Sequence, residues 1–400
     1  MSSNAEGQFS LVDDTHGELK HVLFHYCRAF HHLYAEFLAS IDTDVQVTII
    51  APDLKYDEQD ICRITPEGEE LPDYEQGAEY TLDVLADEIL EEGEKYAKFV
   101  PLLRTLGEKT PMIFKSEYAG KGHPARLLAR QNIDIQIASR YVSPFCRDIA
   151  YFCEDRNIVM GNPACRAEKR SFTEEDVLRK KGFNLRSPIG LPLDEAGELI
   201  ACGKTLYVST NHVAMNLCSR QEAERTLGKI AKGRSLAWIT NGPAYHLDTY
   251  FTPVNDETVC VGDLRAGRRI LAENGIPLAE EECYSAVITE HMGMSFDARQ
   301  TILDRIASSL SRTRKVFRVP LFAFAIAKTP FLFSSLNVAS TISRLWVPSY
   351  QIPGQEEVSE KWREIGAYVG KGLTELTRLG AHDLKDAAIR CLLGNMERAY

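Results

Sequence analysis

Tyr245-His246-Leu247-Asp248-Thr249-Tyr250-Phe251-Thr252 is the stretch from which the interpretation of this sequence starts. The turn-forming residues Asn241-Gly242-Pro243 precede it, and its own residues are largely aromatic or β-branched, which predicts an extended segment. Alternate residues of an extended segment share a face, so we expect His246 and Asp248 to project together while Leu247 points the other way. This places a group that titrates near neutral pH beside a carboxylate, as general acid–base catalysis requires. A half-buried strand with a surface His and Asp is the simpler interpretation of the same pattern.

The bulk composition is that of an ordinary globular protein. Of the 400 residues, 44% are hydrophobic and 26% are charged, so a sizeable core can form. The net charge of −11 argues against nucleic acid or an anionic membrane surface as the main partner and is compatible with a cationic substrate. The most apolar run, residues 319–332, contains two prolines and a lysine, and therefore predicts buried core and not a membrane span.

The ten cysteines are scattered singly, with no C-x-x-C pair and no Cys/His cluster at metal-ligand spacing. A Gly-rich phosphate loop is also missing, so we expect neither a metal nor another cofactor. The first residues, Met1-Ser2-Ser3-Asn4-Ala5-Glu6, have neither the basic nor the apolar region of a secretory signal. We therefore expect a cytoplasmic protein whose thiols are mostly reduced, buried and inert.

Apolar runs of strand length alternate with helical patterns along the chain, which predicts an α/β architecture. Strands are expected at residues 45–50, 133–137, 149–152, 157–160, 205–209, 236–240, 258–261, 315–319 and 345–347. Helices are expected at residues 21–38, 173–181, 220–231, 268–273, 298–312 and 356–379. No linker rich in Pro, Gly or Ser divides the chain. We therefore expect one catalytic domain over residues 1–400, with a flexible segment at 1–18 and mainly helical insertions at 60–110 and 265–312.

Three further segments carry acidic, basic or thiol groups at turns or near the chain end. Arg147-Asp148 follows a turn and begins a predicted strand, so its carboxylate would stand at a strand edge. Asp194-Glu195-Ala196-Gly197-Glu198 is an acidic turn before another strand, and Arg390-Cys391 lies ten residues from the end. Taken alone, these segments are a surface ion pair, a solvated turn and a thiol that fits the nucleophile pattern only loosely.

Taken in order, the four segments resemble those of the guanidino-group-modifying enzymes, which comprise arginine deiminases, agmatine deiminases, dimethylargininases and amidinotransferases. The order is R-D, then acidic-x-G-acidic, then H-L-D-T-x-F-T, then R-C, and it extends over residues 142–393. The resemblance implies a pentein-type α/β propeller, in which ββαβ units surround a polar pocket with pseudo-fivefold symmetry. The segment from His246 to Thr252 and the pair Arg390-Cys391 are most similar to the arginine deiminase branch.

The resemblance also implies roles for individual residues. The implied catalytic residues are the nucleophile Cys391, the acid–base His246, and Glu198. The implied substrate-binding residues are Asp148, Asp248, Glu195, Arg390 and Arg166. Two choices stay open, namely whether Glu195 or Glu198 orients His246, and whether Arg166 or Arg170 binds a substrate carboxylate. The implied partner is a small cationic guanidino compound, and the oligomeric state is left open, a homo-oligomer included.

The expected function is a cysteine-dependent hydrolase that releases ammonia from arginine or a related compound through a covalent amidino-cysteine intermediate. An amidinotransferase that moves the amidino group to an amine is the first alternative, and a non-catalytic protein that binds a guanidino ligand is the second. Departures from the deiminase pattern keep both open. Lys385-Asp386-Ala387-Ala388-Ile389 replaces a run of glycines, and Ala196 and Glu198 replace one Gly and the Asp of an E-G-G-D segment. Residues 143–148 also resemble the C-P-R-D segment of amidinotransferases.

Overall fold

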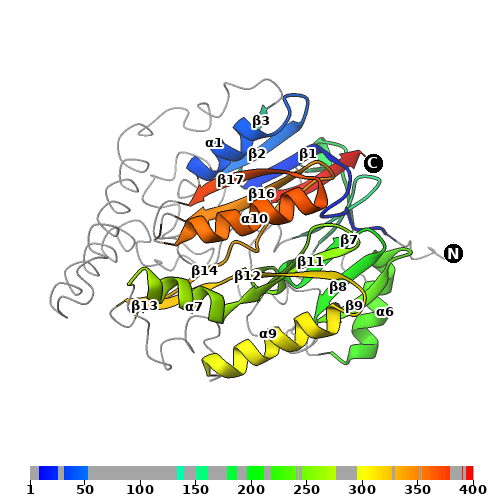
Figure 1. The fold of residues 1–400 in the computed structure, drawn as a ribbon. Helices are drawn as coiled ribbons and strands as arrows, with labels where there is room; N and C mark the ends of the chain where they lie inside the picture. The colour runs from blue at the N-terminus through cyan, green and yellow to red at the C-terminus, as the bar shows by residue number, and fades with distance from the viewer. Residues whose placement is uncertain are drawn as a thin grey trace.

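The first and last strands of the described chain are neighbours in one sheet (Figure 1). β1 (Glu18–His25) pairs antiparallel with β18 (Leu393–Ala399) and parallel with β2 (Gln46–Pro52), and β3 (Ile133–Ala138) extends the sheet beyond β2. This computed structural model describes residues 9–25, 31–52, 133–138, 150–160, 178–186, 196–210, 218–239, 242, 246–275, 295–326, 329–350, 352, 354–378, 390 and 393–399.

The strand order of this sheet, an antiparallel pair followed by a parallel neighbour, recurs in four three-stranded sheets of the described residues. These sheets are β4 (Ala150–Cys153), β5 (Asn157–Met160) and β6 (Asn184–Arg186); β7 (Leu199–Cys202), β8 (Thr205–Ser209) and β9 (Ser235–Ile239); β10 (Phe251–Pro253), β11 (Thr258–Asp263) and β12 (Lys315–Pro320); and β15 (Ala339–Ser340), β16 (Arg344–Tyr350) and β17 (Gly372–Arg378). β13 (Phe322–Ile326) and β14 (Thr329–Phe333) form a separate hairpin. The predicted α/β class is therefore present.

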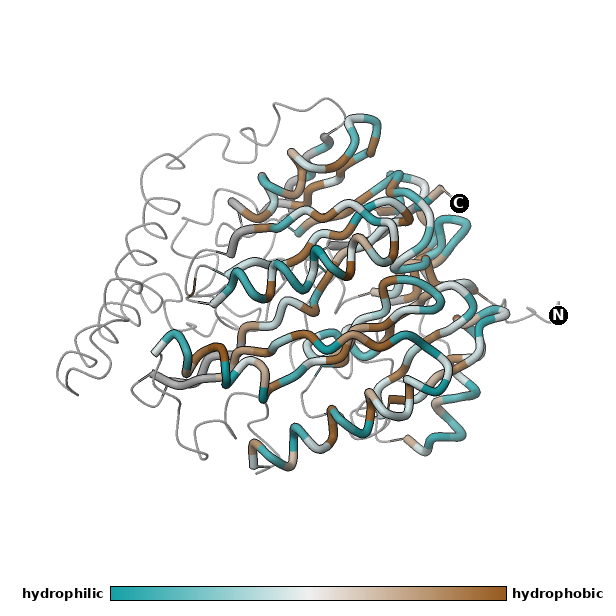
Figure 2. The backbone as a smooth tube through the Cα atoms, in the orientation of Figure 1, coloured by the Kyte–Doolittle hydropathy of each residue, from teal (hydrophilic) through white to brown (hydrophobic). Residues whose placement is uncertain are grey.

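Helices make the crossovers that parallel neighbours require. In the described chain these are α1 (His31–Ser40) between β1 and β2, α6 (Arg220–Ala231) between β8 and β9, α7 (Leu264–Glu273) and α9 (Phe296–Leu310) between β11 and β12, and α10 (Gln355–Val369) between β16 and β17. Hydrophobic and hydrophilic residues alternate along α9 and α10, as expected for helices that bury one face (Figure 2). α7 and α9 lie within the region expected to be helical at 265–312, and both pack on the sheet of β11 and β12. The other expected helical region, 60–110, lies outside the described residues.

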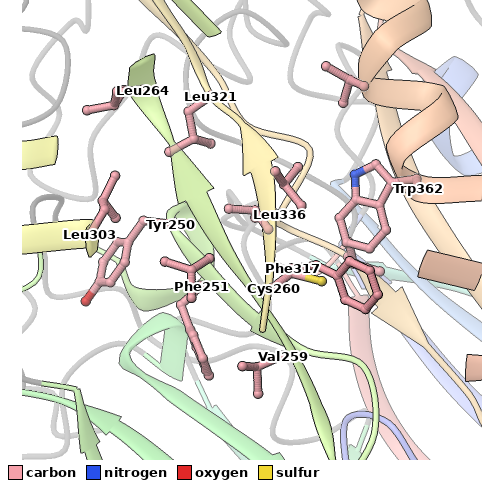
Figure 3. Packing of buried hydrophobic residues seen from close by; sticks show 14 of the residues in the cluster. Tyr250, Phe251, Val259, Cys260, Leu264, Leu303, Phe317, Leu321, Leu336 and Trp362 are labelled. Atoms are coloured by element: carbon pink, nitrogen blue, oxygen red, sulfur yellow. The ribbon is translucent and has the colours of Figure 1, made fainter. Parts of the chain in front are cut away.

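The largest buried apolar cluster of the described residues draws on the sheets from β7 to β17 and on the helices α7, α9 and α10. Tyr250 and Phe251 belong to one side of it, Phe317 and Trp362 to the other, with Leu336 between them (Figure 3). Trp362 and Phe251 are fully buried. This core includes Leu247 and thereby holds η7 (Leu247–Thr249), the short turn that precedes β10.

The N-terminal residues differ from the flexible segment that the sequence predicted. Residues 9–16, here called the N-terminal segment, are buried or half-buried, and Asp13 is only 2% exposed. Leu11 and Ser10 form bridges to Cys153 and Ala231. The expectation is therefore wrong for this segment, because the polar groups that suggested flexibility bind buried partners instead of water.

The helix predicted at residues 21–38 is wrong in its first half, where the structure has β1. Val22, Leu23 and Phe24 are all buried, so both faces of this strand are covered. A strand covered on both faces has a continuous apolar run, and periodicity alone does not separate such a run from a buried helix. The helix α1 starts only at His31.

The helix predicted at 356–379 is too long, because α10 ends at Val369 and β17 follows. Gly370 caps the helix in the left-handed conformation, with φ of 71°, and its N–H donates to the carbonyl of Gly366. A left-handed glycine is a common helix terminator, and it redirects the chain into the strand that starts at Gly372.

Candidate active site

Two short 3-10 turns bring the acidic segment and the His–Asp segment together. η6 (Ala196–Glu198) leads into β7, and η7 (Leu247–Thr249) leads into β10. The ring of His246 lies directly against Gly197, where an added Cβ would stand 2.7 Å from Nδ1 and 2.9 Å from Cγ. Only a residue without a side chain permits this approach. The glycine of the acidic turn is therefore what allows His246 to reach its position.

The extended segment predicted at 245–252 is wrong between Leu247 and Tyr250. His246 itself is extended, but the N–H and the hydroxyl of Thr249 both donate to its carbonyl oxygen, at 3.3 and 2.6 Å. These two bonds close a turn, as Thr side chains often do. His246 and Asp248 consequently do not share a strand face, and the strand begins only at Phe251.

Two carboxylates of these turns, those of Glu198 and Asp248, belong to residues that are 0% exposed. Both act on the phenol of Tyr250. Burial raises the pKa of Tyr250, and the carboxylate of Glu198 raises it further; the Ser209 side chain opposes the shift, and Asp248 adds to it. Two buried carboxylates near one another create a site whose charge suits a cation, since a cation out of water is tolerated only where it is neutralised.

Tyr250 is fixed against the turn that precedes the His–Asp segment. A Cβ on Gly242 would stand 1.9 Å from the Tyr250 hydroxyl oxygen, so position 242 accepts only glycine without rearrangement. The Tyr250 carbonyl accepts the N–H of Gly262 at 2.9 Å, which ties the end of η7 to β11. Gly242, part of the turn that the sequence predicted, is thus required for packing against Tyr250 as well as for the turn itself.

Arg390 reaches the same region from the C-terminal end of the chain. Its backbone N–H donates to Oδ1 of Asn337 at 2.9 Å. Its Nη2 donates to the carbonyl of Leu199, the residue after Glu198, at 3.2 Å, and to Oδ2 of Asp14 at 3.0 Å. The guanidinium therefore binds a protein carboxylate in this structure, and its predicted contact with substrate stays a prediction.

Residues 334–338 connect the His–Asp segment with Arg390. The hydroxyl of Ser334 donates to the carbonyl of Thr249 at 2.6 Å, and Asn337 of the same loop accepts the N–H of Arg390. Tyr350 also holds this loop, because its hydroxyl donates to the Ser334 carbonyl at 3.0 Å. Sequence reasoning missed this loop, although the polar run Ser334-Ser335-Leu336-Asn337 between apolar stretches is a signal that could have identified it.

The other predicted site residues lie outside the described residues. These are Cys391, Asp148, Glu195 and Arg166, together with the alternative Arg170. Their roles stay predictions, as does the choice between Glu195 and Glu198. Cys391 is nevertheless peptide-bonded to Arg390, so the contacts of Arg390 bear on it directly.

The described cysteines are poor nucleophiles. Cys153, Cys202 and Cys260 are buried, and burial raises the pKa of the Cys153 and Cys202 thiols to about 12. Burial also raises the pKa of Cys218, which is half-buried. A thiol with a raised pKa holds little thiolate at neutral pH and reacts slowly.

The described residues contain no group of three or more His, Cys, Asp or Glu side chains placed to hold a metal ion. Nor does any helix in this part of the chain combine the length and the apolar composition needed to cross a membrane.

Solved structures similar to this chain include agmatine deiminases. The agmatine deiminase of C. jejuni matches with a TM-score of 0.60 and 11% sequence identity, over 98% of each chain. The agmatine deiminase of Enterococcus faecalis matches with a TM-score of 0.58 and 9% identity, over 98% of this chain and 96% of its own. No protein-family model matches the chain, and no curated protein matches it by sequence. The predicted similarity to guanidino-modifying enzymes of the pentein type is thus confirmed at the level of the fold.

Proposed function

We propose that this protein is a cysteine-dependent hydrolase of a guanidino group, with Cys391 as nucleophile and His246 as acid–base. The observation that carries this proposal is the convergence of three motif segments that are far apart in the sequence. His246 lies against Gly197, and Arg390 donates to the carbonyl of Leu199, so both meet the acidic turn that contains Glu198. The fold shared with agmatine deiminases supports the same assignment.

The proposal includes the arrangement of the whole chain. We infer one catalytic domain in which five ββαβ units form a propeller about a pseudo-fivefold axis, with the site at the centre. Two observations support this: five sheets share one strand order, and β18 pairs with β1, so that the last strand completes the first unit.

The buried carboxylates suit a guanidinium ligand. A guanidinium is planar and always charged, and carboxylates bind it through paired, charge-assisted hydrogen bonds. Asp148 and Asp248 would hold its nitrogens, and Glu198 or Glu195 would orient His246. Asp248 and Glu198 are both fully buried, which strengthens such bonds because water does not screen them.

The proposed reaction has two steps on one carbon atom. The Cys391 thiolate adds its electron pair to the guanidinium carbon, and a C–N bond breaks as His246 gives a proton to the departing ammonia. An amidino group linked to sulfur remains. His246 then takes a proton from water, the water oxygen bonds to the same carbon, and the C–S bond breaks to return the thiolate and release a ureido product. Because Gly197 lies at the Nδ1 side of the ring, Nε2 is the nitrogen that we assign to these transfers.

Amidino transfer differs in the group that leaves first and in what attacks the intermediate, and residues 143–148 are the feature that favours it. In that reaction an amine leaves first and a second amine then takes the place of water. Transfer requires a site that excludes water until the acceptor arrives. The two reactions can therefore be distinguished by whether product formation requires an amine acceptor.

The test is incubation with agmatine, arginine, a methylated arginine and a peptidyl arginine, each with and without glycine, lysine or ornithine. We expect ammonia and a ureido product without any acceptor, and a covalent adduct on Cys391 by peptide mass spectrometry. Cys391→Ser should abolish both, whereas Cys218→Ser, the same change at a half-buried thiol, should leave them unchanged. Product formed only with an acceptor would establish a transferase. Binding without adduct or product would establish the non-catalytic alternative.

A further inference from the structure

The N-terminal segment supplies a buried carboxylate to the residue beside the proposed nucleophile. Nη2 of Arg390 and Oδ2 of Asp14 are 3.0 Å apart, and their side chains are 4% and 9% exposed. In the sequence the two residues stand at opposite ends of the chain. An ion pair so nearly removed from water is screened little by salt.

Asp14 is itself held on both its backbone and its side chain by β7. Its N–H donates to the carbonyl of Ala201 at 2.8 Å, and its Oδ2 accepts the N–H of Ala201 at 2.9 Å. Arg398 of β18 donates to the Asp14 carbonyl at 3.3 Å. The carboxylate is thus a fixed point on the strand that directly follows Glu198.

We propose that Asp14 is a positioning residue for Cys391 and acts through Arg390. This inference rests on the proposed function, in which Cys391 is the nucleophile. Because Cys391 is bonded to Arg390, the anchors of Arg390 restrict where the thiol can lie. One anchor is the amide of Asn337, and the other is the ion pair with Asp14. Asp14 also neutralises the cation of the residue that precedes Cys391, so in this proposal the pair sets the local charge as well as the geometry.

Asp13 provides a matched control for Asp14. The two aspartates are adjacent and both are buried. Asp13 accepts hydrogen bonds from the backbone N–H groups of Thr15, His16 and Gly203, and its Oδ2 lies 3.5 Å from Nη2 of Arg234. Asp13→Asn and Asp14→Asn therefore remove the same charge from the same segment, but only the second variant removes it from Arg390.

The first readout is the rate at which iodoacetamide alkylates Cys391, followed by peptide mass as a function of pH. Asp14→Asn removes the negative charge paired with Arg390, the residue before Cys391, and should lower the apparent pKa of the thiol, whereas Arg390→Gln removes the positive charge and should raise it. Each shift should be on the order of one pH unit. Two other charged residues lie around the pair: Arg398, which donates to the Asp14 carbonyl, and Glu198, which precedes Leu199. Both are the same in every variant. Asp13→Asn should leave the profile unchanged.

The second readout is steady-state kinetics with the best guanidino substrate. Asp14→Asn should lower kcat about tenfold or more with little change in KM, as expected for a misplaced nucleophile. Arg390→Lys, which keeps the charge without the forked geometry, should fall between Arg390→Gln and the wild type.

Identical alkylation profiles and kcat values for Asp13→Asn and Asp14→Asn would overturn the inference and make Asp14 a structural residue only. If Asp14→Asn does not fold, Asp14→Glu and Arg390→Gln carry the test, and an unchanged Cys391 profile in both would overturn it as well. A wild-type protein without turnover, but with the opposite pKa shifts in Asp14→Asn and Arg390→Gln, would refute the proposed reaction and leave the positioning role intact.

Discussion

His246 occupies a space that exists only because residue 197 has no side chain. Gly197→Ala should push the imidazole away from its position, since the new Cβ would stand 2.7 Å from Nδ1. We expect kcat to fall by about 100-fold, the size of effect that a misplacement of about 1 Å produces. The measurement is kcat together with the melting temperature of each variant.

Gly228→Ala is the control for this change. A Cβ at Gly228 would meet nothing within 4 Å, and this residue lies inside α6. Alanine there should stabilise the protein by about 0.4–1 kcal/mol and leave kcat unchanged. Equal kcat values for the two variants would show that the position of His246 does not matter for turnover.

At this scale the sequence indicated the site only in part. His246, Asp248 and Glu198 were predicted from motif order, and the structure brings their segments together, while their roles stay predictions. Asp14 and Asn337 were not predicted, because each is linked to the site by a contact with Arg390 that no local pattern encodes. Asp14 lies in a largely polar stretch near the start of the sequence, and such a stretch suggests a frayed end until the partner of its carboxylate is known.

Among the elements, the N-terminal segment carries a pH-dependent contact. Nδ1 of His16 lies 3.2 Å from Asp13, and Nε2 lies 3.4 Å from Asp256. The hydrogen bond with Asp13 raises the pKa of His16; burial opposes the shift, the charges of Asp13 and Asp256 add to it, and Lys371 opposes it. Since the pKa of Asp13 is lowered to about 2, this carboxylate stays charged wherever His16 titrates.

We therefore expect His16 to stabilise the fold in its charged form. A folded-state pKa above the unfolded one gives stability that is fully present below about pH 6.5 and is lost as the pH rises through the folded pKa. His16→Gln should lower the melting temperature more at pH 5.5 than at pH 8.5. The corresponding difference in the free energy of unfolding should be under about 1 kcal/mol, because the His16 ring is partly exposed to water. An equal loss at the two pH values would mean that His16 contributes packing and not charge.

Elements with strong local signals were predicted best. The bounds of α6 agree with the prediction because Ser219 and Glu222 form a capping box, in which the Ser219 hydroxyl accepts the Glu222 N–H and the Glu222 carboxylate accepts the Ser219 N–H. β5 and β8 also have the predicted bounds. β1 and η7 were missed for different reasons. Burial on both faces hides the period of β1, and two bonds from Thr249 override the strand preference of its neighbours.

For the whole molecule, the pairing of β18 with β1 predicts that the last residues are needed for folding. β18 forms one side of the first sheet, and Arg398 within it donates to the carbonyls of Asp14 and His16. A chain that ends at residue 392 should lose its cooperative thermal transition, whereas a chain that lacks only Tyr400 should melt like the wild type. Circular dichroism measures both. A truncated chain with the wild-type transition would show that β18 is dispensable.

The α/β alternation was enough to predict the α/β class, and the motif order predicted the similarity to deiminases that the solved agmatine deiminase structures bear out for the fold. The closure of the first sheet by the last strand was not predicted from residue patterns, because the pairing partners are separated by nearly the full chain. Nothing in the sequence of β1 or of β18 predicts that the two strands pair. Strand pairs so far apart in the sequence are also the slowest to form, because the entropy cost of closing the long intervening loop comes before any contact energy is gained.

This closure has a consequence for synthesis on the ribosome. Domains generally fold from the N-terminus as the chain emerges, yet here β1 leaves the exit tunnel long before its antiparallel partner has been translated. Until β18 has emerged, β1 presents an unpaired strand edge, which is a known aggregation hazard. Cys391 immediately precedes the β18 region in the sequence, so a chain cut before residue 391 lacks both the thiol and the strand that completes the first sheet. If Cys391 is the nucleophile, as we propose, such a fragment loses turnover together with the partner of β1.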